Sequence, residues 1–433
     1  MNASNQKDFL RILRKLFTGS WLFVVVFLGI NLITGQVLVQ KFGFDPAQSD
    51  PNWVLASRLF SEPIPRTAER SLFPPLLMLG WQSLFGASSL SAFVYKLLFY
   101  AGFILVFWRV VQKVCTDRLV TILAVYFTIL SPYLAWAVYI SPEVSPDLLA
   151  ISLIMWCAVT IYTENTFSAV VGLGAAGALA TLIREPNILV FPAISGYLYL
   201  SSRLTLNKLL MSSAVFLAGI SPLIAWNYYV TGAVTLSTRS GINLLIGNNP
   251  YYLEIHPRYD IEHNLMTWIN SEFQDQLQNL DEIERDRFFR KEAFKYMRSD
   301  PVRTIHLLLL KTLWWFGPTR IPNSNQLAYL LVNEEMTTIT LKGRPDIIKD
   351  LMYNIHRIAV LTGVLFLLYW KHPCYFWKKG LLLLMPTLAL LPLVILTFPD
   401  TRFRLAFDPY LFILASFGYS TLVTKLVSTF LKS

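Results

Sequence analysis

The stretch LLMSSAVFLAGISPLIAWNYY, from Leu209 to Tyr229, indicates the fold class of the chain. It contains no Asp, Glu, Lys or Arg, and a helix needs about 20 predominantly apolar residues to cross the hydrocarbon core of a bilayer. The aromatic residues at its end, Trp226 to Tyr229, are of the kind that anchor a helix at the membrane surface. We therefore predict a membrane-spanning helix here.

A polar segment with two glycines and three asparagines follows this span, RSGINLLIGNNP, from Arg239 to Pro250, and we call it the Gly–Asn segment. Its glycines would let the backbone turn tightly or approach a ligand closely, and its asparagines can cap turns or meet sugar hydroxyls. One interpretation is a set of substrate-binding residues, namely Asn243, Gly247, Asn248 and Asn249. The other is that the segment only shapes the exit from the span into a large outer region.

The composition of the whole chain is that of a membrane protein. Of its 433 residues 54% are hydrophobic and only 15% are charged, and the mean hydropathy is +0.48. The net charge of +10 comes mostly from Lys and Arg in short loops, where such residues orient membrane spans. We therefore expect no nucleic-acid partner.

Apolar runs of similar length recur and predict ten membrane-spanning helices. They cover residues 18–39, 92–112, 119–139, 147–163, 168–183, 187–202, 208–229, 354–370, 380–398 and 406–428. With the N-terminus inside, all but one of the inner loops carry Lys or Arg, as the positive-inside rule requires. The first run shows no clear cleavage site, so we expect an uncleaved span. The cysteines, which do not face outward on this topology, are not expected to form a disulfide.

The predicted fold is an all-α polytopic membrane protein in three parts. Residues 1–229 are expected to form an N-terminal membrane module with a first outer loop, 40–91, that carries short helices and acidic residues. Residues 230–353 form a larger, mixed extracytoplasmic region, and residues 354–433 form the C-terminal transmembrane helices.

Two helical segments are expected in the extracytoplasmic region. Asp281, with Glu284 three residues later, resembles a helix cap; an apolar stripe follows at helical spacing, and Pro301 ends it. We predict an amphipathic helix on the outer membrane surface, with its stripe used for packing. The apolar segment 305–316 is too short to span a bilayer and is expected to be re-entrant or interfacial.

Acidic residues and arginines recur in short turns at the outer ends of the predicted spans. They are Asp45, Asp50, Glu143, Asp147, Arg184, Glu185, Asp400, Arg402, Arg404 and Asp408. Each alone is an ordinary loop charge, but an ionisable group beside lipid is costly without a partner or a task. A carboxylate can take a proton from an attacking hydroxyl, and guanidinium groups can hold a departing phosphate. Together they favour a transferase whose leaving group is a phosphate.

These motifs resemble, in order, those of the polyprenyl-phosphate-dependent membrane glycosyltransferases of the GT-C type. The likeness is nearest to the branch that includes protein O-mannosyltransferases and lipid A aminoarabinose transferases, and it extends weakly over nearly the whole chain. It rests on DPNWVLASRL, RSLFPPLL, PEVSPDLL, LIREPNIL, the Gly–Asn segment and the closing RFRLAFDPY. The sequence departs from the family where many members carry two adjacent acids, because Asp45 and Asp50 are separated.

The resemblance implies a hexosyl- or pentosyltransferase that moves a sugar from a polyprenyl-phosphate donor with inversion. Asp50, or else Asp45, would deprotonate the acceptor hydroxyl, and Glu143 would orient the acceptor or help to hold a divalent metal ion. The predicted phosphate-binding residues are Arg402, Arg404 and Arg184. Some relatives use a metal and others do not, and the ligands are unknown. His256 and His263 are expected to be surface residues.

The acceptor could be a glycan, a lipid or a protein, and the sugar is not specified. The expected location is a bacterial plasma (inner) membrane, with the active site facing the periplasm. Two other functions stay open. One is a lipid-linked glycan polymerase or ligase, whose donor carries a diphosphate. The other is a transporter or flippase, for which mid-span charges and internal repeats would be typical.

Overall fold

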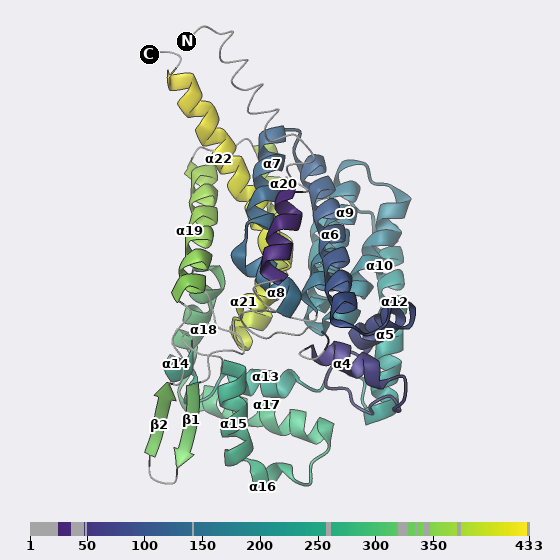
Figure 1. Ribbon diagram of the computed structural model, residues 1–433, viewed down its shortest axis with the longest axis vertical. Coiled ribbons are helices and arrows are strands. Elements are labelled where there is room, and N and C mark those ends of the chain that lie inside the picture. The colour runs from purple at the N-terminus through teal and green to yellow at the C-terminus, as the bar shows by residue number, and fades with distance from the viewer. Residues whose placement is uncertain are drawn as a thin grey trace.

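The computed structural model describes residues 25–35, 47, 50–140, 143–256, 261–318, 328–333, 336–341, 347–369 and 374–430. It is an all-α polytopic membrane fold. Upright helices fill the upper part of Figure 1, and the helices from α13 (Ser240–Gly247) to α17 (Glu282–Ser299) gather at the lower end. Following the predicted orientation, we call this lower end the outer end and the opposite one the inner end.

The upright helices correspond in position to the predicted spans. They are Val25–Gly35, α6 (Ser89–Val114), α7 (Arg118–Ile129) with α8 (Pro132–Ile140), α9 (Val144–Thr163), α10 (Phe167–Ile183), α11 (Val190–Leu200), α12 (Leu206–Thr231), α19 (Ile347–Tyr369), α20 (Cys374–Leu396) and α22 (Asp408–Phe430). Within the described residues six of them are long and apolar enough to cross a membrane, or seven if α7 and α8 count as one span. The count of ten stays a prediction, since Val25–Gly35, α10 and α11 are shorter.

The predicted span 119–139 is a bent pair of helices rather than a straight one. α7 and α8 meet at an angle of 50°. Pro132 lies at the break and has no N–H to continue the hydrogen bonds of α7, and the Ser131 hydroxyl accepts from the Leu134 amide at 3.4 Å at the start of α8. Hydropathy measures length and polarity, so it does not detect such a bend.

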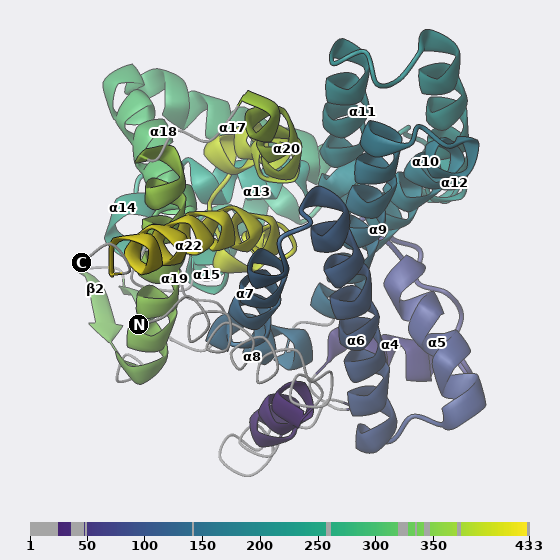
Figure 2. The same cartoon turned by 90° about the horizontal axis from the view of Figure 1, so that it is seen from above.

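The upright helices form two groups when seen from above. In Figure 2, α6, α9, α10 and α12 lie on one side, and α7, α19, α20 and α22 lie on the other. α9 packs against both α6 and α10, and α22 packs against both α7 and α19. A continuous apolar core runs through both groups.

The outer elements are helices of four to eighteen residues and one β-hairpin. They are α4 (Pro51–Arg58), α5 (Phe73–Phe85), η1 (Glu185–Leu189), α13, α14 (Tyr252–Ile255), α15 (Ile261–Glu272), α16 (Gln274–Leu277), α17, α18 (Pro301–Phe316) and α21 (Thr401–Arg404), with an antiparallel hairpin of β1 (Ala328–Asn333) and β2 (Met336–Leu341). In the hairpin, Ala328 pairs with Leu341 and Asn333 pairs with Met336.

Both predicted helices of the extracytoplasmic region are present. In α17 the Asp281 side chain accepts from the Glu284 amide at 2.8 Å, and the Glu284 side chain accepts from the Asp281 amide at 3.1 Å, which completes the cap. The apolar residues Phe289 and Ala293 pack inward. α18 leaves a stripe exposed that includes Leu309 and Leu313, which fits an interfacial helix that contacts lipid.

A strap in the first outer loop, residues 66–71, joins parts of the chain that are far apart in sequence. The Ala68 amide donates to Glu282 Oε2 at 3.0 Å, and the Ala68 carbonyl accepts from the Thr238 amide at 3.0 Å. The Ser71 amide donates to Glu185 Oε1 at 2.5 Å. The strap therefore fixes α5 against both η1 and the N-terminus of α17.

The glycines of the Gly–Asn segment allow close packing of α13. A Cβ on Gly241 would overlap the backbone oxygen of Asp286 in α17, and a Cβ on Gly247 would overlap the backbone oxygen of Thr397, just after α20. α13 is thus held between α17 and the end of α20. These glycines bring backbone against backbone, and this accounts for their presence without a ligand.

Gly247→Ala is expected to destabilise the protein by about 1–3 kcal/mol, because the added methyl group forces α13 away from α20. Gly80→Ala in α5 is the matched control, since a Cβ there meets nothing within 4 Å, and it should be neutral or stabilising by up to about 1 kcal/mol. Thermal unfolding of the purified variants measures both effects. Equal stabilities for the two variants would contradict the packing role.

His256, expected at the surface, is buried in the core of the outer region. Its ring stacks on Tyr252 at 5.0 Å and meets the edge of Trp314 at 4.5 Å. Burial, together with the positive charge of Lys311 nearby, lowers the pKa of His256 to about 3. The unfolded chain therefore binds the proton more readily than the folded chain between pH 3 and pH 6.5, so the contribution of His256 to stability falls as the pH falls through this range.

We expect the protonation of His256 in the unfolded chain to lower the free energy of unfolding by about 2 kcal/mol when the pH falls from 7 to 5. His256→Phe should remove that part of the pH dependence, whereas His306→Phe, at an exposed position of α18, should leave it unchanged. Hydrogen exchange of the α13 and α14 amides at the two pH values measures the effect. An unaltered pH dependence in His256→Phe would refute the assignment.

Candidate active site

The candidate site lies at the outer ends of the membrane helices. Its first residue in the sequence is Asp50, the N-cap of α4. Its Oδ1 accepts from the amides of Asn52 and Trp53 at 3.0 and 3.2 Å, and Pro51 follows at the first helical position. A short acid followed by proline is a common start for a helix. The predicted acid-led helix of the first outer loop is therefore present.

The other oxygen of Asp50 forms an ion pair that was not foreseen. Lys96 Nζ of α6 lies 2.6 Å from Asp50 Oδ2, and both side chains are 0% exposed. Lys96 also donates to the carbonyl of Tyr139 at 2.8 Å. The pair therefore joins α4, α6 and α8. A lysine within an apolar span is a signal for a buried partner, and the sequence contained it in SAFVYKLLFY.

Asn52 connects this ion pair to Glu143. Its amide nitrogen lies 3.4 Å from Glu143 Oε1. Glu143 stands at the N-cap of α9, where its side chain is 29% exposed, and its Oε2 lies 3.8 Å from Nε of Arg184. Glu143 is thus a carboxylate that has polar neighbours and is also partly exposed at the surface of the protein.

Arg184 and Asp147 form the next part of the site. Arg184 follows the last residue of α10, and its Nη1 lies 3.2 Å from Asp147 Oδ2. Asn187 of η1 donates to Asp147 Oδ1 at 2.6 Å and to the carbonyl of Ala180 at 3.1 Å. Asp147 is therefore satisfied from both sides, while the Arg184 side chain remains 13% exposed. The role of Asn187 was not foreseen.

The ring of Phe403 brings two of the predicted phosphate-binding arginines together. The guanidinium carbon of Arg184 lies 5.1 Å from the ring centroid, and that of Arg402 lies 5.9 Å from it. Arg402 is held by Asp400, whose Oδ2 lies 2.8 Å from both Nε and Nη2. Two cations from distant turns thus contact one aromatic side chain, and one of them, Arg184, also lies near Glu143.

Arg404, the third predicted phosphate ligand, is buried and used by the fold. Its Nη1 donates to the carbonyls of Trp315 and Gly317 at 2.7 and 3.3 Å, and its Nη2 bonds the hydroxyl of Tyr353. It therefore holds the C-terminal end of α18 against α19. The Arg404 side chain is buried, and phosphate binding by it stays a prediction.

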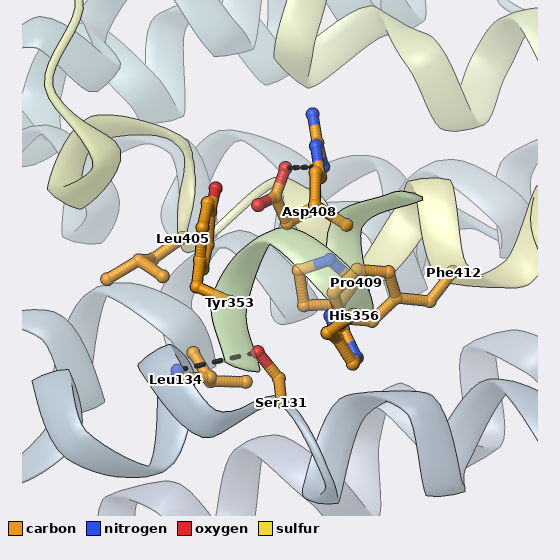
Figure 3. A pocket seen from close by; sticks show the side chains of 9 residues that line it. Ser131, Leu134, Tyr353, His356, Leu405, Asp408, Pro409 and Phe412 are labelled. Carbon is orange, nitrogen blue, oxygen red and sulfur yellow. Dashed lines mark hydrogen bonds and ion pairs between the residues drawn. The ribbon is translucent and has the colours of Figure 1, made fainter. Parts of the chain in front are cut away.

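A small cavity lies where α8, α19 and α22 meet, and Tyr353, which Arg404 contacts, is part of its lining. Figure 3 shows its lining, in which Asp408 is paired with Arg357 and His356 lies below Pro409. The Asp408 and Arg357 atoms are 2.7 Å apart. The cavity has a volume of ≈ 10 Å³, about that of one water probe, so it is too small for a sugar.

The asparagines predicted to bind substrate support α13 and the end of α20. Asn248 donates to the carbonyls of Leu244 and Leu396 at 2.8 and 2.6 Å, and its oxygen accepts from Lys311 at 3.1 Å. Asn249 donates to two carbonyls of α13. Both are buried and Asn243 is half-buried. The segment thus positions the turn that carries Arg402, and sugar contacts by its residues stay a prediction.

The structure describes only some of the residues needed to examine the predicted metal ion and Asp45, the alternative base. Asp45 lies outside the described residues, and so does the side chain of His263. Among the residues with described positions, no group of three or more His, Cys, Asp or Glu side chains is arranged to hold a metal ion. Cys115 and Cys157 are free thiols.

A comparison with models of protein families finds a match over part of this chain. Residues 69–226 match the family model described as dolichyl-phosphate-mannose-protein mannosyltransferase. The matched segment contains Glu143, Asp147 and Arg184, while Asp50 and Arg402 lie outside it. Neither the curated proteins nor the solved structures contain a significant match to this chain.

Proposed function

We propose that this membrane glycosyltransferase of the GT-C type transfers a sugar from a polyprenyl-phosphate donor to an acceptor hydroxyl at the outer face of the membrane. The observation that carries the proposal is that Arg184 lies near both the Glu143 carboxylate and the Phe403 ring, which Arg402 also contacts. One carboxylate and two guanidinium groups, beside an apolar helix bundle, fit a lipid-linked phosphate and an attacking hydroxyl. The name of the matched family supports mannose as the first sugar to test.

The two arginines would hold the donor phosphate. Guanidinium groups bind phosphate oxygens by paired hydrogen bonds, and donors aimed at developing charge stabilise it most in a site that excludes water. As the bond between the anomeric carbon and the phosphate oxygen breaks, its electrons pass to that oxygen. The polyprenyl phosphate then leaves as an anion and needs no proton, while its hydrocarbon chain stays among the apolar helices.

Glu143 is the carboxylate that we assign as the base. It would accept the proton of the acceptor hydroxyl while the oxygen attacks the anomeric carbon on the face opposite the phosphate, which inverts the configuration. A base must come within hydrogen-bond reach of the hydroxyl, and the 29% exposure of Glu143 allows this approach. Asp50, the first choice from the sequence, is fully buried against Lys96, so we assign it the role of positioning α4 and Asn52.

The proposal is tested by measuring the release of polyprenyl phosphate from a panel of polyprenyl-phosphate sugars, with the protein in lipid nanodiscs. Release that requires an acceptor extract would support a transferase. Turnover of diphosphate donors only would indicate the polymerase or ligase function. Movement of lipid across a vesicle membrane without any release would indicate a flippase. Addition of EDTA, followed by Mg²⁺ or Mn²⁺, tests the divalent ion that the resemblance leaves open.

We further propose the plasma membrane of a bacterium as the location, with the site facing the periplasm. The support is the distribution of Lys and Arg in the inner loops. Labelling of a single added cysteine in the loop after α4 with an impermeant reagent, in intact cells, tests this orientation.

A further inference from the structure

The charged residues of α17 are sorted between its two faces. All four acids of the helix serve the fold: Glu282 binds the strap, Glu284 completes the cap, Asp286 accepts from Ser240 and Gly241, and Glu292 is buried beside Lys295. Six basic residues share the same helix. Its acids are therefore turned inward or held, and its cations dominate the outward face.

The outward face carries a regular stripe. Arg287, Lys291, Phe294 and Arg298 follow one another at intervals of four, three and four residues, and all four are exposed. Residues at this spacing lie on one side of a helix. Among the described residues, Arg287, Lys291 and Arg298 have no acidic partner, whereas Arg290 and Lys295 at the margins are paired. We call these four residues the α17 stripe.

The position of the stripe favours a soluble anionic partner over a lipid surface. A helix that binds a bilayer inserts its apolar face, but the apolar face of α17, with Phe289 and Ala293, is packed into the core of the outer region. Figure 1 places α13 between α17 and the upright helices. The exposed face is thus polar and cationic, with one aromatic side chain, which is the composition of a site for a charged glycan.

We propose that the α17 stripe binds an anionic polysaccharide, with carboxylates or phosphates along its chain, as the acceptor that the enzyme modifies. That the polysaccharide is the acceptor rests on the proposed function. That the α17 stripe binds an anionic polysaccharide does not depend on it. The N-terminus of α17 holds the strap, and the strap is bonded to Glu185, the neighbour of Arg184. The strap therefore connects the start of α17, through residues 68–71, with the turn that carries Arg184.

Binding is tested without any donor, so that failure of transfer and failure of binding are told apart. The full-length protein in nanodiscs of zwitterionic lipid is titrated into a fluorescent oligouronate, with neutral dextran of equal length as the control ligand, and anisotropy is recorded. We expect the triple variant R287Q/K291Q/R298Q to bind about tenfold more weakly than wild type, and wild-type binding to weaken as salt increases.

The matched control is R109Q/R118Q/K425Q, which removes three exposed cations near the inner end and should bind like wild type. Equal binding by the two triple variants would overturn the proposal, as would no binding by wild type. Protection of α17 amides from hydrogen exchange by anionic vesicles, with no response to oligouronate, would instead assign the stripe to a membrane surface. If R287Q/K291Q/R298Q loses oligouronate binding but turns over a short neutral acceptor like wild type, the stripe binds the polymer and takes no part in the transfer reaction.

Discussion

Glu143→Gln is expected to lower kcat for sugar transfer by about 10²–10⁴-fold, the range that a positioned general base contributes. The substitution keeps the shape of the side chain and the contact with Asn52, but the amide cannot take the proton of the acceptor hydroxyl. Since the substitution leaves Arg184 and Arg402, the proposed phosphate ligands, in place, the KM for the donor should change little. Release of polyprenyl phosphate at saturating donor and acceptor measures the effect.

Glu62→Gln is the control for this experiment, because Glu62 is an exposed carboxylate of the first outer loop, at the same end of the molecule as Glu143. It should retain full activity. The base assignment fails if Glu143→Gln keeps the kcat of wild type. In that case a well-folded but inactive variant of Asp50 would return the role to the first outer loop.

Asp50→Asn is expected to destabilise the folded protein by about 3–5 kcal/mol, because it leaves the buried ammonium group of Lys96 without its counter-charge. Lys96→Met should cost a similar amount by leaving the carboxylate uncompensated. The double variant D50N/K96M removes both charges, and replacement of a buried pair by uncharged groups is often nearly neutral. It should therefore recover most of the lost stability, as measured by thermal unfolding followed by tryptophan fluorescence.

The double variant also tests whether Asp50 only positions α4 or takes part in the reaction. If Asp50 positions α4 and Asn52, D50N/K96M should regain activity together with stability. A double variant that is as stable as wild type but inactive would instead show that the carboxylate of Asp50 takes part in the reaction. Asp50→Asn with the full stability of wild type would contradict the ion pair itself.

The sequence was sufficient for the fold because long apolar runs have few alternatives in a membrane. A run such as Leu209–Tyr229 must satisfy its backbone internally, so it becomes a helix, and α12 covers it. The helix cap at Asp281 could also be predicted, because it involves only residues within one turn of each other, and both of its hydrogen bonds are present. The bend at Pro132 and the shortness of α11 depend on packing against other helices, which a hydropathy pattern does not contain.

The site was only partly foreseeable, since its contacts join distant residues. Charges at the outer span ends pointed to Glu143 and Arg184, which the structure brings together. They did not show that Arg184 would contact Phe403, which is more than two hundred positions away, or that Arg404 would be buried by contacts with Trp315 and Tyr353. Asn52 and Asn187 resemble ordinary helix-start residues in the sequence. Only Lys96, charged within a span, carried a signal that could have been used.

The strap has a consequence for biosynthesis. The bond between Ala68 and Glu282 joins residues 214 positions apart, and a ribosome adds roughly 5–20 residues per second. After Ala68 leaves the ribosome, about 10–40 s pass before its partner is made, and several further helices are inserted in that time. The first outer loop thus reaches its final shape late. A chain truncated before α17 is expected to insert its early helices yet leave that loop open to protease at the outer face.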